Sequence, residues 1–229
     1  MDNINSPSNP TGSGYTKDEI IALSKILIKY KNLYILSDDI YEHNTYDGFK
    51  FFTIAQIEKL KSRTLTMNGV SKSYSMTGWR IGYAAGPKEI IKAMAKIQSQ
   101  STSNPTSISQ AAAVEALNGR QDFILERSNS FKERRNFVVD SLNNIKGISC
   151  LSPEGAFYVF PNCKKLLNKK TKLKTDKEFV EKLLEKAEVA VVQGSAFGLE
   201  GYFRISYATS MENLKKAMKR IKTFCDSLN

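Results

Sequence analysis

One lysine in this 229-residue chain lies in a setting that suits covalent chemistry. Lys72 follows Ser71 in a run of small hydroxyl residues, and Arg80 comes eight positions later. A lysine shifts its pKa readily when it is buried or lies near another cation, which suits a Schiff-base amine. The guanidinium fork of an arginine matches phosphate geometry. The spacing therefore indicates a pyridoxal phosphate site, held covalently by Lys72 and through its phosphate by Arg80; a charged surface loop is the alternative.

Two acidic residues follow a short apolar segment that reads as a buried strand. Asp38 and Asp39 come directly after Leu33–Ser37, whose composition is typical of a parallel sheet. Ligands of open α/β sheets bind at the carboxyl ends of the strands. A carboxylate there would stabilise a protonated pyridine nitrogen and so favour an electron-withdrawing cofactor ring. The alternative for either aspartate is the capping of a nearby helix or loop.

Two further polar side chains lie far apart in the sequence. Asn9 belongs to a cluster of turn residues, and Arg204 lies among apolar and aromatic residues of an expected strand, Tyr202–Tyr207. A buried arginine needs an anionic partner, and a substrate carboxylate gripped by two hydrogen bonds would be one. The alternatives are simple turn chemistry for Asn9 and an outward-facing arginine on an amphipathic strand.

These segments together resemble the fold type I aminotransferases, and within them the class I, aspartate-type enzymes of the bacterial branch. The resemblance runs along the whole chain. It rests on four motifs in a fixed order, Asn9-Pro10-Thr11-Gly12, Asp38-Asp39-Ile40-Tyr41, Ser71-Lys72 with Arg80, and Phe203-Arg204-Ile205-Ser206.

The resemblance implies a role for each residue of these motifs. Lys72 would hold pyridoxal phosphate and then move a proton at the substrate α-carbon. Asp38, rather than Asp39, would pair with the ring nitrogen, because the motif spacing joins it to Tyr41. Tyr41 and Asn9 would donate to the phenolic oxygen, although Tyr41 could simply pack in the core. Arg80 would bind the cofactor phosphate, and Arg204, together with Asn9, would bind the substrate carboxylate.

The implied activity is transamination between an amino acid, with aspartate expected, and a 2-oxo acid such as 2-oxoglutarate; prephenate is a further acceptor in this branch. The resemblance also implies a homodimer whose subunits share their sites. Two alternatives remain open: another fold type I enzyme such as an amino-acid lyase, and an inactive fragment or interaction module. We expect a reading frame that lacks the family's N-terminal arm, glycine-rich phosphate loop and ring-stacking residue, so the chain alone should have little transaminase activity.

One smaller departure lies near the end of the chain. The family usually has proline before the Gly-Ser-x-Phe-Gly loop, where this chain has Gln193 before Gly194. Because proline restricts the unfolded chain, Gln193 should loosen this loop slightly.

Composition and charge exclude several classes of function. The net charge is +11, but the dense lysine stretch Lys164–Lys177 has no interleaved aromatic residues, so we expect no nucleic-acid partner. One histidine and three widely spaced cysteines give no metal pattern and no disulfide framework, which favours a reducing cytoplasm. No apolar run is long enough for a membrane span, so we expect no membrane partner.

The order of the expected elements predicts an α/β fold with a second, smaller domain. Strands and helices alternate early, as in an open and mostly parallel sheet, which we assign to residues 1–130 as part of a large cofactor-binding domain. Residues 131–229 should form a smaller α+β domain. We expect helices at 16–31, 87–99, 106–117, 121–143, 176–187 and 210–226, and strands at 33–37, 63–67, 81–85, 155–160, 189–192 and 202–207.

Overall fold

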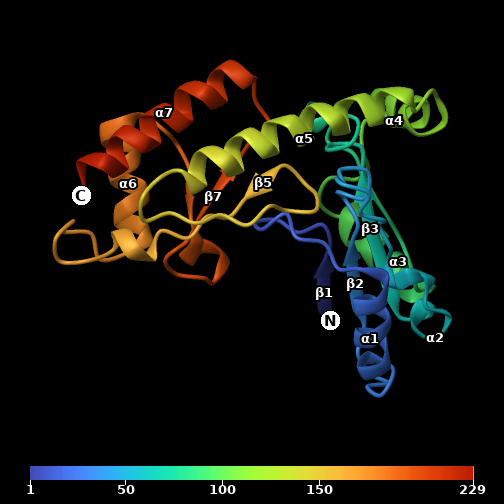
Figure 1. Ribbon diagram of the computed structural model, residues 1–229. Coiled ribbons are helices and arrows are strands. Elements are labelled where there is room, and N and C mark those ends of the chain that lie inside the picture. Colours follow the sequence, from blue (N-terminus) through green and yellow to red (C-terminus); the bar gives the residue numbers. More distant parts are fainter. Residues whose placement is uncertain (229) are drawn as a thin grey trace. The chain divides into compact units, whose positions relative to one another are not determined.

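The computed structural model describes residues 1–228, and the contacts within the chain divide it into two compact units (Figure 1). Unit 1 comprises Met1–Pro7 and Gly14–Ser128, and unit 2 comprises Ser8–Ser13 and Asn129–Asn229. The later boundary falls within the helix α5 (Asp122–Asn143), which contributes to both units. The fold is α/β, as expected, but a six-residue segment near the N-terminus belongs with the C-terminal unit.

Unit 1 is built on a four-stranded sheet in the order β1-β2-β3-β4. The strands are β1 (Asp2–Asn5), β2 (Ile35–Asp38), β3 (Thr64–Gly69) and β4 (Gly82–Ala85). The first three are parallel and β4 is antiparallel to β3. The register aligns Asn5 with Asp38 and Asp38 with Met67, so the carboxyl ends of the three parallel strands meet at one edge of the sheet.

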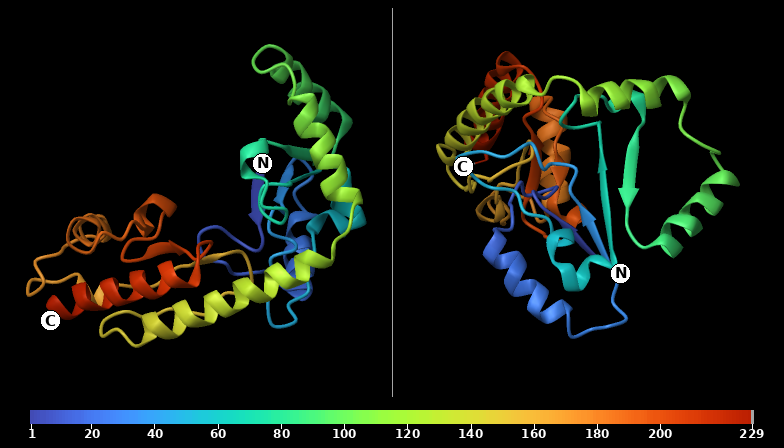
Figure 2. Two further views of the ribbon diagram at one scale, coloured as in Figure 1. Left: turned by 90° about the horizontal axis from the view of Figure 1, so that it is seen from above. Right: turned by 90° about the vertical axis from the view of Figure 1, so that its right-hand side faces the viewer.

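Three helices of unit 1 lie close to their expected positions, namely α1 (Lys17–Leu27), α3 (Lys88–Ser99) and α4 (Ser107–Asn118). The short α2 (Glu58–Lys61) was not expected, and the unit also contains the 3-10 helices η1 (Ile54–Gln56) and η2 (Thr77–Trp79). The buried side chains of α1 pack against β1, β2, η1 and α2, and Figure 2 shows α1, in blue, beside the sheet.

The ends of α1 have local and distant causes. The expected capping box is present: the Thr16 hydroxyl accepts from the Glu19 amide, and the Glu19 carboxylate accepts from the Thr16 amide at 2.8 Å. The helix ends at Leu27, earlier than expected, where the Arg63 guanidinium donates to the Leu27 carbonyl at 2.9 Å. A cation at the last carbonyls of a helix is favourable, and this one comes from the residue before β3, far along the chain.

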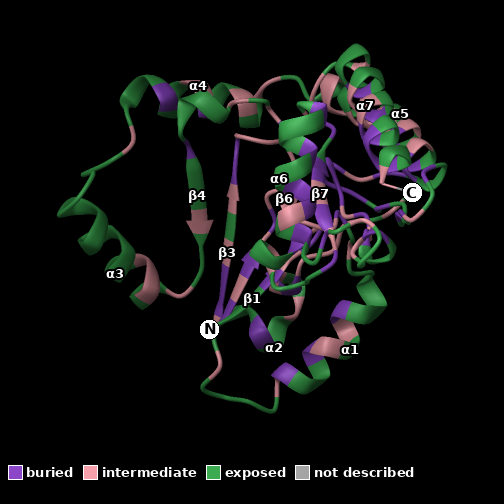
Figure 3. Cartoon of the chain, turned by 90° about the vertical axis from the view of Figure 1, so that its left-hand side faces the viewer, coloured by how far each residue is buried: buried purple, intermediate pink, exposed green. Residues whose placement is uncertain are grey.

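The other side of unit 1 carries apolar side chains that the described residues leave uncovered. No residue of α3 is buried, and Ile97 on α3 and Ile108 on α4 are 72% and 73% exposed. Figure 3 shows α3 almost entirely in the exposed colour. The strands β1 and β4 each pair with a single neighbour and form the two edges of the sheet.

Unit 2 combines a three-stranded antiparallel sheet with the C-terminal part of α5 and two further helices. The sheet order is β5-β7-β6, formed by β5 (Tyr158–Val159), β7 (Phe203–Ser206) and β6 (Val192–Gln193). The helices are α6 (Asp176–Ala187) and α7 (Met211–Ser227), and two 3-10 turns are η3 (Lys164–Leu166) and η4 (Gly194–Phe197). In Figure 1, α6 and α7 appear in orange and red, and they pack together through Phe179 and Phe224, whose ring centroids are 5.7 Å apart.

The segment Ser8–Ser13 is held in unit 2 by a close backbone approach. The Gly155 amide donates to the Gly12 carbonyl at 2.9 Å, and Gly12 has a φ of +71°. A side chain at Gly12 would meet the Pro153 Cβ at 2.5 Å and the Gly155 carbonyl oxygen at 2.8 Å. The glycine of the Asn-Pro-Thr-Gly motif is therefore required both by its conformation and by the lack of space.

The two adjacent aspartates at the end of β2 face different surroundings because side chains alternate along a strand. Asp39 shares its face with Ser37, is 5% exposed and accepts a hydrogen bond from the Ser37 hydroxyl at 2.7 Å. Burial raises the pKa of Asp39, and hydrogen bonds from Ser37 and Thr53 offset this only in part. Asp39 is thus an internal carboxyl group of unit 1.

We predict that Asp39→Asn stabilises the protein at neutral pH. A carboxyl whose folded-state pKa is raised binds its proton more tightly in the folded chain, so its contribution to stability falls as the pH rises from the unfolded to the folded pKa. Asparagine removes the buried charge and keeps an oxygen for Ser37. Urea unfolding should show a gain at pH 7 above the roughly 0.5 kcal/mol scatter of surface changes, and no gain at or below the unfolded pKa of about 4. The exposed Asp2→Asn is the control; an equal gain at both pH values would contradict the prediction.

Gln193 lies where proline would fit the backbone. Its φ is −60° and its ψ is 144°. The Gly194 amide donates to the Tyr202 carbonyl at 2.7 Å, and Gln193 is the partner of Phe203 in the antiparallel ladder. Hydrogen-bonded and non-hydrogen-bonded pairs alternate in such a ladder, so the Gln193 amide points away from β7.

Gln193→Pro should therefore raise the free energy of unfolding by about 0.4 to 1 kcal/mol, because it restricts the unfolded chain without removing a ladder hydrogen bond. The measurement is urea unfolding of both proteins, with Gln193→Ala as the control that changes the side chain alone. A loss of stability in the proline variant would show that the amide has a partner that matters.

Candidate active site

Asp38 and Lys72 lie at the carboxyl edge of the parallel strands in unit 1. Asp38 is the last residue of β2, and Lys72 lies in the turn that follows β3, where its carbonyl accepts from the Ser75 amide at 3.1 Å. Burial raises the pKa of Asp38, while the Ile40 amide, at 3.4 Å, and the charge of Lys72 act in the opposite direction. A partly desolvated carboxylate within the field of a lysine is an arrangement that favours a cationic partner.

Two further expected residues belong to the same unit. Tyr41, in the turn after β2, is 3% exposed. Arg80 follows η2, has a φ of +55°, is exposed, and donates from Nη1 to the Thr77 carbonyl at 2.7 Å. Four of the six expected site residues therefore lie in unit 1, at the end of β2 and on the segments that follow β2, β3 and η2.

Arg204 and Asn9 meet in unit 2, although they are 195 positions apart in the sequence. The Arg204 Nη1 donates to the Asn9 Oδ1 at 2.7 Å. The guanidinium lies between two aromatic rings, with its central carbon 4.6 Å from the centroid of Tyr158 and 5.0 Å from that of Phe197. Cation–π contacts of this kind hold a guanidinium in place but leave its in-plane donors available.

One of those donors has no partner. The Arg204 Nε is buried and makes no hydrogen bond to any part of the chain that the structure describes. A buried donor without a partner costs about 1 to 3 kcal/mol, and more for a charged group. A carboxylate would satisfy it, because an arginine binds a carboxylate through a pair of N–H groups.

The sequence analysis did not identify the two rings beside Arg204. Tyr158 lies in the expected strand near Gly155, and Phe197 lies in the Gly-Ser-x-Phe-Gly loop, which we considered only for the residue before it. The signal that could have predicted these rings was the aromatic residue that each of the two segments contains.

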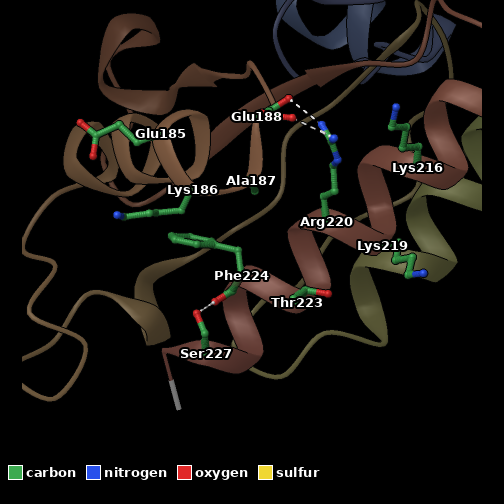
Figure 4. A pocket seen from close by; sticks show the side chains of 10 residues that line it. All are labelled: Glu185, Lys186, Ala187, Glu188, Lys216, Lys219, Arg220, Thr223, Phe224 and Ser227. Carbon is green, nitrogen blue, oxygen red and sulfur yellow. Dashed lines mark hydrogen bonds and ion pairs between the residues drawn. The ribbon is translucent and has the colours of Figure 1, made fainter.

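A pocket of about 540 Å³ in unit 2 contains none of these residues. It lies between the C-terminal parts of α6 and α7 (Figure 4), and its charged side chains do not converge: Arg220 pairs with Glu188 at 2.8 Å, while Lys216 and Lys186 point to opposite sides. Within residues 1–228, no cluster of histidine, cysteine and acidic side chains could hold a metal ion. None of the helices described has the length and apolar character needed to cross a membrane.

Comparisons with known proteins place the motifs in one family. The family model for aminotransferase class I and II matches residues 3–221. The chain is 57% identical to an aspartate aminotransferase of Rhizobium meliloti and 58% identical to a "probable aspartate/prephenate aminotransferase" of Rickettsia typhi, over 99% and 98% of its length. It covers 56% and 58% of those two proteins, and so spans a little over half the length of these relatives.

Solved structures give the same answer. A crystal structure of the aspartate aminotransferase from Rhizobium meliloti matches 98% of the chain with a TM-score of 0.94 at 57% identity, and the chain covers 57% of it. The aspartate aminotransferase of Thermus thermophilus with maleate matches 96% of the chain with a TM-score of 0.87 at 41% identity, again with 56% of that protein covered. The sequence motifs, the α/β fold and these matches agree: the chain belongs to the class I and II aminotransferases, a family of pyridoxal-phosphate enzymes.

Proposed function

We propose that this chain is the part of a pyridoxal-phosphate-dependent transaminase that carries the reactive lysine and the arginine for the substrate carboxylate. The proposed exchange is between aspartate and 2-oxoglutarate, with prephenate as a further acceptor. The observation that carries the proposal is the Arg204 guanidinium, which has a buried unpaired Nε and a fixed position between two rings. Unit 1 would correspond to part of the large cofactor-binding domain and unit 2 to the small domain.

The donor set of unit 1 fits pyridoxal phosphate. The Asp38 carboxylate is partly desolvated with a raised pKa, so a protonated ring nitrogen would supply the cation that it lacks. Asp39 does not suit this role, because it is turned inward to Ser37. Lys72 supplies a primary amine at the same edge of the sheet, Arg80 supplies the phosphate ligand, and Tyr41 a donor to the phenolic oxygen.

When bound, pyridoxal phosphate supplies an electron-withdrawing ring that makes the substrate α-proton acidic. Asp38 would hold the proton on the ring nitrogen and thereby maintain that withdrawal. Lys72 would hold the cofactor until the substrate amine takes its place, and its free Nζ would then accept the proton from the substrate α-carbon and donate it to the cofactor. These are general acid–base steps by a single positioned amine.

Arg204 and Asn9 orient the substrate. Because the Asn9 Oδ1 already accepts from Arg204, its Nδ2 is the group that donates elsewhere, to the cofactor's phenolic oxygen in this proposal. The remaining in-plane donors of Arg204 bind the α-carboxylate, a group common to amino acids and 2-oxo acids. We propose a substrate with a second carboxylate because the relatives are named for aspartate, and because the Thermus structure was determined with the dicarboxylate maleate.

Two further parts of the proposal concern assembly and compartment. The exposed apolar side chains of α3 and α4 favour association, and we propose a homodimer for the complete enzyme. The three cysteines are free and buried, and burial raises the pKa of each to about 12. Thiols kept unreactive in this way are compatible with the cytoplasm that we propose.

The first test concerns Lys72. The chain is mixed with pyridoxal phosphate, reduced with borohydride and digested, and the modified peptide is identified by mass spectrometry. We expect Lys72 alone to be modified, and aspartate added before the reduction to protect it, because the substrate amine displaces the lysine. Lys72→Arg should abolish the modification while Lys88→Arg, at an exposed lysine of the same unit, should not. Modification spread over many lysines would refute the assignment.

The second test concerns Arg204. Arg204→Lys should weaken aspartate and 2-oxoglutarate alike, by about ten- to a hundredfold, because a lysine cannot form the paired hydrogen bonds to a carboxylate. Isothermal titration calorimetry, with each compound added to the chain in the presence of pyridoxal phosphate, measures both affinities. Arg220→Lys, at a surface arginine paired with Glu188, is the control. Unchanged affinity for both compounds would remove Arg204 from the substrate site.

A further inference from the structure

Asp176, the first residue of α6, is a buried carboxylate that the proposed chemistry does not use. It is 2% exposed, and its Oδ2 accepts from the Ser195 amide at 2.7 Å. Burial alone would raise the pKa of Asp176, but hydrogen bonds from Ser195 and from the backbone amides of Asp176 and Gly201 together hold it below the ordinary value. An acidic residue in the first turn of a helix is common, but this one reaches out of its own helix to the loop between β6 and β7.

The loop that Asp176 holds carries one of the two rings beside Arg204. Ser195 is the second residue of the turn η4, which ends at Phe197, and the loop closes through the Gly194 amide, which donates to the Tyr202 carbonyl at 2.7 Å. The Phe197 ring contacts Phe160 edge to face, at 6.1 Å between centroids, and lies 5.0 Å from the guanidinium carbon of Arg204. The Asp176 carboxylate therefore contacts this loop through the Ser195 amide, two residues before Phe197.

Few hydrogen bonds fix the side chain of Arg204. Its one side-chain hydrogen bond to the described residues is the one to Asn9, and its Nε has none. Of the two flanking rings, Tyr158 is fixed in β5, whereas Phe197 lies on a loop whose conformation is not set by strand pairing. A change in the loop would therefore move Phe197 and release one face of the guanidinium.

We propose that Asp176 is a positioning residue for Arg204: through the Ser195 amide it fixes the turn that carries Phe197, and Phe197 fixes the direction of the guanidinium. For substrate affinity, this inference rests on the proposed role of Arg204. The positioning itself does not, and can be measured without any ligand.

The deciding experiment is NMR of the ligand-free full chain, observing the Nε–H resonance of Arg204, which Arg204→Lys identifies by removing it. Ring currents from the flanking aromatic residues determine where this resonance lies. We expect Phe197→Ala to shift it, Asp176→Ala to shift it in the same direction, and the double variant to add little. Asp176→Asn, which keeps an acceptor oxygen for Ser195, should restore the original position. Glu181→Ala is the matched control, since it removes an exposed acid from the same helix.

The affinity for 2-oxoglutarate, with pyridoxal phosphate present, provides the second readout. Asp176→Ala should weaken it by about three- to tenfold, the value of one lost cation–π contact, with Asp176→Asn within about twofold of the original. An Arg204 resonance that moves in Phe197→Ala but not in Asp176→Ala overturns the inference. A resonance that moves as expected, with affinity unchanged even in Arg204→Lys, instead overturns the substrate role of Arg204. If Asp176→Ala does not fold, Asp176→Glu keeps the charge but displaces the carboxylate from the Ser195 amide, and an unmoved resonance there also overturns the inference.

Discussion

The half-buried guanidinium of Arg204, between two aromatic rings, organises the candidate substrate site of unit 2. A donor that is taken out of water must be matched by an acceptor, or it costs stability. Arg204 receives one acceptor from Asn9 and two faces from Tyr158 and Phe197, and its Nε stays unpaired. The Asn-Pro-Thr-Gly segment, the strand β5 and the loop after β6 are all arranged to supply these contacts. The unpaired donor is the feature that connects this arrangement to a carboxylate ligand.

Unit 1 meets a different constraint, which comes from strand direction. Three parallel strands in register bring their carboxyl ends to one edge of the sheet. Strand pairing alone therefore brings the residues just beyond β2 and β3 close together. Alternation along β2 then separates two adjacent aspartates, directing Asp39 to Ser37 and leaving Asp38 near Lys72. Two aspartates therefore differ in role, Asp39 as an internal hydrogen-bonded group and Asp38 as a candidate site carboxylate, because adjacent residues of a strand point to opposite faces.

The features predicted well from the sequence are those with local causes. The capping box at Thr16 and the bounds of α6 follow from residues within one helical turn. The strand β1 was not predicted, because Asp2–Asn5 has little apolar character and becomes a strand by pairing with β2. The strand expected at 189–192 is instead Val192–Gln193, because the register of β7 decides which residues pair. The role of Asp176 could not be predicted, since its partner Ser195 is 19 positions away and nothing in the helix sequence indicates that contact.

The assignment of Ser8–Ser13 to unit 2 has a consequence for synthesis. Arg204 is added 195 positions after Asn9, which takes roughly 10 to 40 s at typical elongation rates. The backbone contact of this segment with Gly155 becomes possible earlier, but Asn9 lacks its arginine partner throughout that interval. Once Arg204 has been translated, the contact between Asn9 and Arg204 closes a long loop. The entropy cost of this closure is only slightly larger than for a loop half as long. The delay therefore sets the order of assembly: the segment Ser8–Ser13 completes its contacts in unit 2 only after Arg204 has been translated.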